Sequence, residues 1–121
     1  MRTNIKATGT ELTTAIREYV EKRLRKVESL IKTAEDDVAQ VEIGKTSAHH
    51  GKGDVFRAEI NVQSGGVMYR AVSEMDDLYA AIDDARDELV REVKSKKGKG
   101  ETAFRKGARR LKNILRFGRE E

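Results

Sequence analysis

The spacing of apolar residues changes several times along this chain, and these changes constrain the fold more than any other feature. Residues 1–7 alternate between apolar and polar, which is the period of a half-buried strand. From Leu12 to Ile31 the apolar residues recur every three or four positions, which predicts a helix with Thr13 as its N-cap, running to about Ala34. Alternation returns in residues 38–45, 55–63 and 67–73 and predicts three more strands. A second helical pattern begins near Asp76 and Asp77 and is expected to bury Leu78, Ile82, Ala85, Leu89 and Val93.

The element order is therefore β-α-β-β-β-α, which is typical of an α/β fold. A right-handed crossover through the first helix makes the first two strands parallel. The turn Ser64-Gly65-Gly66 predicts a tight hairpin, because glycine tolerates the positive φ that such turns require. Both helices need the same side of the sheet to bury their apolar faces, so we expect a two-layer sandwich of a four-stranded sheet and two helices. We expect one domain over residues 1–97, followed by a basic amphipathic tail over residues 98–121.

Charge is divided unevenly between the two parts of the chain. Residues 1–93 contain 14 Lys or Arg and 18 Asp or Glu, a net charge of −4. Residues 94–121 contain 11 Lys or Arg and 3 Asp or Glu, a net charge of +8. A mildly acidic body with a basic end favours a polyanionic partner, and nucleic acid is the commonest one.

Several classes of chemistry have no support in the sequence. The chain has no cysteine, which excludes disulfides and thiolate metal sites and fits a cytoplasmic protein. His49 and His50 are adjacent in a glycine-rich stretch without a third ligand nearby, so we expect no metal. There is no phosphate-binding glycine loop and no nucleophile motif. We therefore expect no enzyme activity, no cofactor, no small-molecule substrate and no membrane span.

Two segments resemble a known family. Glu11-Leu12-Thr13-Thr14-Ala15-Ile16-Arg17-Glu18-Tyr19-Val20 resembles the first helix of ribosome hibernation promoting factors and ribosome-associated inhibitor A. Asp76-Asp77-Leu78-Tyr79-Ala80-Ala81-Ile82-Asp83 is similar to the opening of their second helix. The resemblance covers roughly residues 2–97, and the length of the chain matches the short members of the family, which lack a second, dimerising domain.

This resemblance implies a fold akin to the double-stranded-RNA-binding domain. It also implies a binding site in the mRNA channel of the small ribosomal subunit, across the A and P sites. Binding there would exclude tRNA and mRNA and inhibit translation under stress or in stationary phase. We expect a protein that is monomeric when free and ribosome-associated when bound. The alternative is a general double-stranded-RNA-binding module that is not tied to the ribosome.

Three basic residues of the first helix are candidate rRNA contacts. Lys22, like Arg25 and Lys32, follows a glutamate by four residues, a spacing that favours weak ion pairs within a helix. Arg23 and Lys26 have no acid three or four positions away. Either their stems pack on the domain with the charge in water, or the charge is kept for a phosphate. Because both match basic positions of the family, we predict rRNA contacts at Lys22, Arg23 and Lys26.

The second helix changes from acidic to basic along its length. Asp83, Asp84, Asp87 and Glu88 make its beginning acidic, and Glu88 stands where the family leads us to expect lysine. We expect Arg86 to pair with Asp83, with an rRNA contact as the alternative. The basic end supplies the remaining predicted contacts, Arg91, Lys94, Lys96 and Lys97. We expect Tyr19 to pack in the core, and Tyr79 either to pack or to reach a backbone group.

The tail shows helical spacing of apolar residues from Phe104 to Leu115. Its possible rRNA contacts are Arg105, Arg109, Arg110, Lys112 and Arg116. We favour a basic amphipathic helix that lies along rRNA or a ribosomal protein. A segment that folds onto the domain or orders only when bound, and a helix on a membrane surface, are the alternatives.

Overall fold

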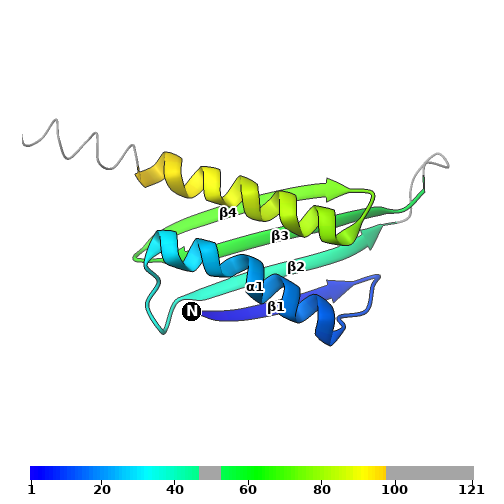
Figure 1. The fold of residues 1–121 in the computed structure, drawn as a ribbon, viewed down its shortest axis with the longest axis horizontal. Helices are drawn as coiled ribbons and strands as arrows, with labels where there is room; N and C mark the ends of the chain where they lie inside the picture. Colours follow the sequence, from blue (N-terminus) through cyan, green and yellow to red (C-terminus); the bar gives the residue numbers. More distant parts are fainter. Residues whose placement is uncertain (47–52, 98–121) are drawn as a thin grey trace, which may run out of the picture.

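The computed structural model describes residues 1–46 and 53–97 of the chain. Strand β1 (Arg2–Thr8) is followed by helix α1 (Thr14–Ile31) and by strands β2 (Val38–Thr46), β3 (Val55–Ser64) and β4 (Val67–Met75). A second helix then covers residues 78–97 (Figure 1). The predicted order of elements is confirmed. The tail and most of the loop between β2 and β3 lie outside the described residues.

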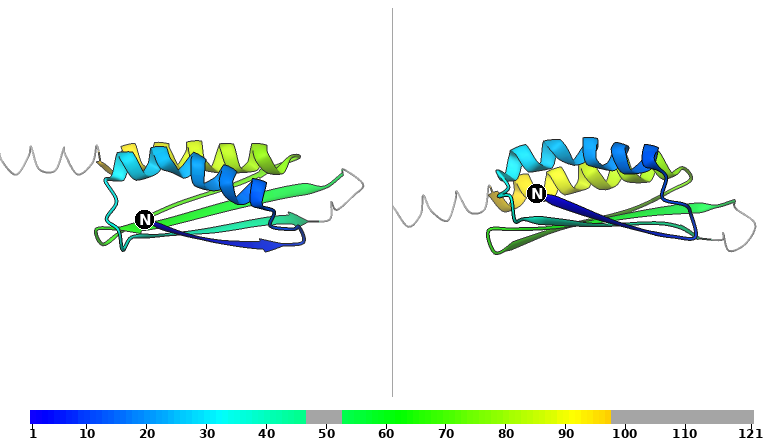
Figure 2. Two further views of the ribbon diagram at one scale, coloured as in Figure 1. Left: turned by 60° about the horizontal axis from the view of Figure 1, so that its bottom comes forward. Right: turned by 90° about the horizontal axis from the view of Figure 1, so that it is seen from below.

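The four strands form one mixed sheet in the order β1-β2-β3-β4. β1 pairs with β2 in parallel, and the pairs β2–β3 and β3–β4 are antiparallel. Figure 2 shows both helices on the same side of this sheet, so no helix of the described residues covers the other side. The two-layer arrangement predicted from the sequence is confirmed, and the two helices run in the same direction (Figure 1).

Helix α1 begins as predicted and ends earlier than predicted. The Thr13 side chain accepts a hydrogen bond from the backbone N–H of Ile16 at 3.2 Å, which is an N-cap. At the other end Lys32 adopts the left-handed conformation, with φ of 56°, and donates its N–H to the Glu28 carbonyl. The Asp37 side chain accepts a hydrogen bond from the N–H of Ala34 at 2.7 Å, so Ala34 belongs to the following turn and not to the helix.

The core lies between the helix layer and the covered side of the sheet. α1 contributes Ile16, Val20, Leu24 and Val27, and strands β2, β3 and β4 contribute alternating apolar residues. All five apolar residues expected on the second helix are buried, and Ala81 and Val90 join them. Tyr19 is partly buried and packs against this core. Between β3 and β4, Gly65 and Gly66 have φ of 57° and 77°, as the hairpin prediction required.

The side of the sheet opposite the helices is mostly polar, although β4 adds the exposed Met68 and Val72 to it. It carries Arg2, Asn4 and Lys6 on β1, and the register continues this row of polar side chains across β2 and β3. Glu59 is buried on this side because arginines surround it, with Nε of Arg70 at 2.8 Å and Nη2 of Arg57 at 3.7 Å from its Oε1. A buried carboxylate paired in this way avoids the cost of an isolated buried charge.

The outer edge of β4 is contacted by side chains of the second helix. The backbone N–H of Arg70 donates to Oε2 of Glu92 at 2.6 Å. Nζ of Lys96 donates to the carbonyl of Met68 and lies 3.2 Å from Oε1 of Glu92. Two side chains one helical turn apart therefore satisfy neighbouring backbone groups at the start of this edge strand.

Candidate nucleic-acid interface

The helix layer carries the basic residues that the sequence singled out. Lys22, Arg23 and Lys26 project from α1, and Arg91, Lys94, Lys96 and Lys97 project from the second helix. All of them except Arg23 are exposed. The tail residues proposed as contacts, from Arg105 to Arg116, lie outside the described residues.

Three of the seven residues form neither an ion pair nor a side-chain hydrogen bond in the described part of the chain. These are Lys22, Lys26 and Lys94. The predicted pair between Glu18 and Lys22 does not form, nor do the equivalent pairs of Arg25 and Lys32. Exposed pairs of this kind contribute only about 0.2–0.5 kcal/mol, which offsets little of the side-chain entropy lost in forming them. Arg25 is therefore a further exposed cation without an acid partner in the described part of the chain, although its spacing from Glu21 predicted a pair.

The other four residues are engaged within the protein. Arg91 pairs with Glu88, and Lys96 with Glu92 and the β4 edge. Nζ of Lys96 also lies 5.2 Å from the centre of the Tyr69 ring. Nζ of Lys97 donates to the carbonyl of Leu30, in the last turn of α1, where a cation is favoured by the helix dipole. Of the four predicted contacts at the basic end of the second helix, Lys94 alone has no internal partner among the described residues.

Arg23 is paired with an acid of the other helix. Its Nε lies 2.9 Å from Oδ1 of Asp83, in a close ion contact that lacks the alignment of a hydrogen bond. The expectation that this charge is unneutralised was wrong, because the acid comes from a residue sixty positions away and not from α1. The predicted pair of Arg86 with Asp83 was also wrong. Nε of Arg86 lies 2.9 Å from Oδ1 of Asp87, and the partner of Asp83 is Arg23 instead.

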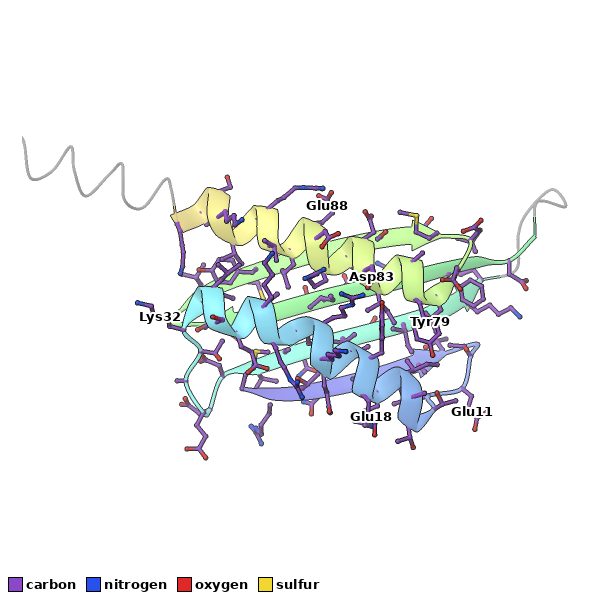
Figure 3. All side chains as sticks on the ribbon, viewed as in Figure 1. Glu11, Glu18, Lys32, Tyr79, Asp83 and Glu88 are labelled. Carbon is purple, nitrogen blue, oxygen red and sulfur yellow. The ribbon has the colours of Figure 1, made fainter. Side chains whose placement is uncertain are left out.

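Tyr19 completes this contact between the helices. Its hydroxyl donates to Oδ1 of Asp83 at 2.6 Å and accepts from Nη2 of Arg23 at 2.9 Å. The ring of Tyr79 meets the ring of Tyr19 edge-on, with centroids 4.8 Å apart. Asp83 and Tyr79 lie on the second helix on the side of α1, whereas Glu88 lies on the side turned away from α1 (Figure 3). We call Tyr19, Arg23 and Asp83 the interhelical triad.

Each carboxylate at the acidic start of the second helix has its own partner. Asp83 belongs to the interhelical triad, and Oδ2 of Asp84 accepts from the Ser73 hydroxyl at 2.6 Å. Asp87 contacts Arg86, and Glu88 contacts Arg91. Just before them, Asp77 caps the helix by accepting from the N–H of Ala80 at 3.0 Å. Because these carboxylates are paired locally, the acidic run repels a polyanion less than its sequence implies.

Other kinds of site have no counterpart in the described residues. Residues 1–46 and 53–97 contain no group of three or more potential metal ligands, and His49 and His50 lie outside these ranges. No helix in the same ranges is long and apolar enough to cross a bilayer. One open depression of about 550 Å³ lies between β4 and the second helix, and its lining includes the charged residues Arg70, Asp84, Glu88 and Glu92.

Comparison with known proteins identifies similar sequences and folds. Residues 3–101 match the model of the family described as Sigma 54 modulation protein / S30EA ribosomal protein. The crystal structure of the Thermus thermophilus Protein Y N-terminal domain is similar at 37% identity, with a TM-score of 0.62, over 78% of this chain and 98% of that one. A ribosomal subunit interface protein from Coxiella burnetii shares the fold at 20% identity, with a TM-score of 0.58, over 78% of this chain and 97% of that one.

Proposed function

The chain belongs to the Sigma 54 modulation protein / S30EA ribosomal protein family, and from this premise we propose that it is a ribosome hibernation factor. It binds rRNA of the small subunit in the mRNA channel, across the A and P sites. There it excludes tRNA and mRNA and inhibits translation under stress or in stationary phase. The block is steric, so no catalytic step or cofactor is part of the proposal.

The observation that carries the proposal is the set of lysines on the helix layer that have neither an ion pair nor a hydrogen bond within the described residues. Lys22 and Lys26 stand one turn apart on α1, on the part of the helix that faces away from the buried residues Val20, Leu24 and Val27. Lys94 lies next to the buried Val93 on the second helix and is itself exposed. Because the described residues do not neutralise these three ammonium groups, they are available to phosphates.

Folded rRNA is a suitable partner for such a surface. Structured RNA is recognised largely by its shape, its phosphates and its 2′-hydroxyl groups. A rigid two-layer body with cations at fixed positions meets that requirement without base-reading side chains. Aromatic stacking on bases is not needed, and the chain has only three Phe and three Tyr.

A charge-reversal experiment tests this proposal. We expect Lys22→Glu with Lys26→Glu to weaken binding to purified small subunits and to lower the slope of log K against log salt by about 2, one for each lost phosphate contact. The matched control is Arg2→Glu with Lys6→Glu. It changes the net charge equally, but on the open side of the sheet. The control should bind like the wild type apart from a small general loss.

The opposite results would contradict the proposal. Equal weakening by both double variants would mean that net charge, and not the helix layer, governs binding. Wild-type protein that fails to sediment with small subunits even at low salt would remove the ribosome as its target. Displacement from subunits by an excess of plain duplex RNA would favour a general duplex binder.

A further inference from the structure

The guanidinium of Arg23 is held from two sides by groups that belong to different helices. Nη2 donates to the Tyr19 hydroxyl on its own helix, and Nε contacts Asp83 on the second helix. The carbon of the guanidinium also lies 4.9 Å from the centre of the Tyr19 ring. A planar group fixed at two nitrogens and one face has little freedom left to rotate.

One nitrogen of this group remains available. Nη1 of Arg23 has no hydrogen-bond partner in the described part of the chain, and it is not among the buried polar atoms that lack one. The side chain as a whole is 37% exposed. The two N–H groups of Nη1 are thus open to solvent beside Lys22, on the same helix layer as Lys26.

We infer that Tyr19 and Asp83 are positioning residues that orient Arg23, so that Nη1 donates to a phosphate of small-subunit rRNA. This inference rests on the proposed function and assigns a role within its binding surface to two residues that carry no positive charge. A long side chain fixed before binding loses less conformational entropy on binding, which increases affinity. Arginine suits this task because it can bind two internal groups and still present a free edge to a phosphate.

The surroundings of Tyr19 keep this arrangement in place. Burial, and then the hydrogen bond to Asp83, raise the pKa of the Tyr19 phenol above its ordinary value. The hydroxyl therefore stays protonated at neutral pH and continues to donate to Asp83. Its oxygen is left to accept from Arg23, and the edge-on contact with Tyr79 supports the ring.

The charge of Asp83 does not argue against a phosphate nearby. Its Oδ1 receives the Tyr19 hydroxyl and contacts Arg23, so its charge is compensated inside the protein. If Asp83 instead competed with rRNA for Arg23, removing its charge would strengthen binding. Positioning and competition therefore predict effects of opposite sign for Asp83→Asn.

A double-mutant cycle on the full chain tests the inference. Affinity for purified small subunits is measured for Tyr19→Phe, Arg23→Gln, the double variant and the wild type, at several salt concentrations. We expect Tyr19→Phe to weaken binding by about threefold to tenfold, the range that one hydrogen bond contributes. Arg23→Gln should weaken it more and lower the salt slope by about 1. In the Arg23→Gln background the second change should have no further effect, because Tyr19 acts through Arg23.

Controls separate positioning from folding. Tyr79→Phe removes a hydroxyl that has no hydrogen bond within the described residues, and it should bind like the wild type. Asp83→Asn should weaken binding, and the Tm of each variant shows that the domain is folded. Equal losses from Tyr19→Phe in both backgrounds, no loss in either, or tighter binding by Asp83→Asn would overturn the inference. Absence of wild-type binding would instead overturn the proposed function, and the inference with it.

Discussion

Asp37 shows how one side chain can join segments that are distant in the sequence. Its Oδ2 accepts from the hydroxyl of Ser64 at 2.6 Å and from the N–H of Ala34 at 2.7 Å. Its backbone carbonyl accepts from the N–H of Arg2 at 2.8 Å. The turn after α1, the end of β3 and the start of β1 therefore meet at this residue. The bond from Ser64, followed by that from Ala34, lowers the pKa of the Asp37 carboxyl below its ordinary value.

This lowered pKa makes the contribution of Asp37 to stability depend on pH. A carboxylate with a depressed pKa in the folded state stabilises the fold above the unfolded pKa and loses this effect as pH falls through the folded pKa. We expect Asp37→Asn to lower Tm near neutral pH. The difference from the wild type should shrink as pH falls below 3.8, the ordinary value. Thermal unfolding followed by circular dichroism at several pH values measures this, and a difference that is constant down to the acid limit would contradict it.

Residues of the candidate interface were only partly predictable from sequence, and Arg23 shows why. Spacing along one helix identifies partners three or four residues away, and by that criterion Arg23 has none. Its actual partner, Asp83, becomes its neighbour only through the packing of two parallel helices. Tyr19 was correctly expected against the core, but no periodicity indicates that its hydroxyl reaches the second helix. Lys22, Lys26 and Lys94 were predictable as exposed cations because that follows from the helix pattern alone.

Among the elements, β4 combines an exposed edge with exposed apolar side chains. Val67, Met68 and Val72 are each more than a third exposed. An edge strand of this kind is prone to pair with another chain. On this edge, the Glu92 side chain accepts a hydrogen bond from the N–H of Arg70, and the Lys96 side chain donates one to the carbonyl of Met68. Charged side chains placed along an edge are a common protection against such pairing.

We expect Glu92→Ala with Lys96→Ala to expose this edge and to cause concentration-dependent self-association of the purified protein. Light scattering coupled to size-exclusion chromatography measures it. The control is Glu88→Ala with Arg91→Ala, which removes an ion pair of the same helix that does not contact the strand backbone. If the first double variant keeps the elution and mass of the wild type at every concentration, these side chains do not protect the edge.

The elements themselves were predictable because apolar periodicity reflects burial, and burial decides which segments become helix or strand. Their ends were less predictable. α1 stops at Ile31 because Lys32 adopts the left-handed conformation. In the following turn, the Asp37 side chain accepts a hydrogen bond from the N–H of Ala34. β4 continues two residues beyond its apolar alternation, to Met75, because β3 still offers it a partner in Phe56. Ends set by such contacts leave no trace in the period of the sequence.

For the molecule as a whole, positive charge is concentrated after residue 97. The buried apolar residues that the structure describes all lie between Ile16 and Val93. Residues 1–97 contain 17 basic and 18 acidic residues, whereas residues 98–121 contain 8 and 3. Residues 1–97 are thus nearly neutral overall, and most of the excess positive charge follows them in the sequence.

We expect a chain shortened to residues 1–97 to unfold cooperatively with a Tm close to that of the full chain, because the described core remains complete. Its binding to small subunits should be weaker and less dependent on salt, since the removed residues carry a net charge of +5. Calorimetry and sedimentation with subunits measure the two effects. A large fall in Tm would place the end of the domain beyond residue 97, and unchanged binding would remove the tail from the interface.

The position of the second helix at the end of the fold has a consequence during synthesis. The strands pair in the order in which they are made, so each can join the sheet as it leaves the exit tunnel. Seven of the nineteen buried apolar residues, however, come from the last helix, and they emerge after the entire sheet. Until then the part of the core that this helix completes is uncovered, and Asp83, the partner of Arg23, has not yet been translated. Under the proposed function, a nascent chain therefore has an incomplete binding surface, and it cannot act on the ribosome that makes it until the second helix has emerged.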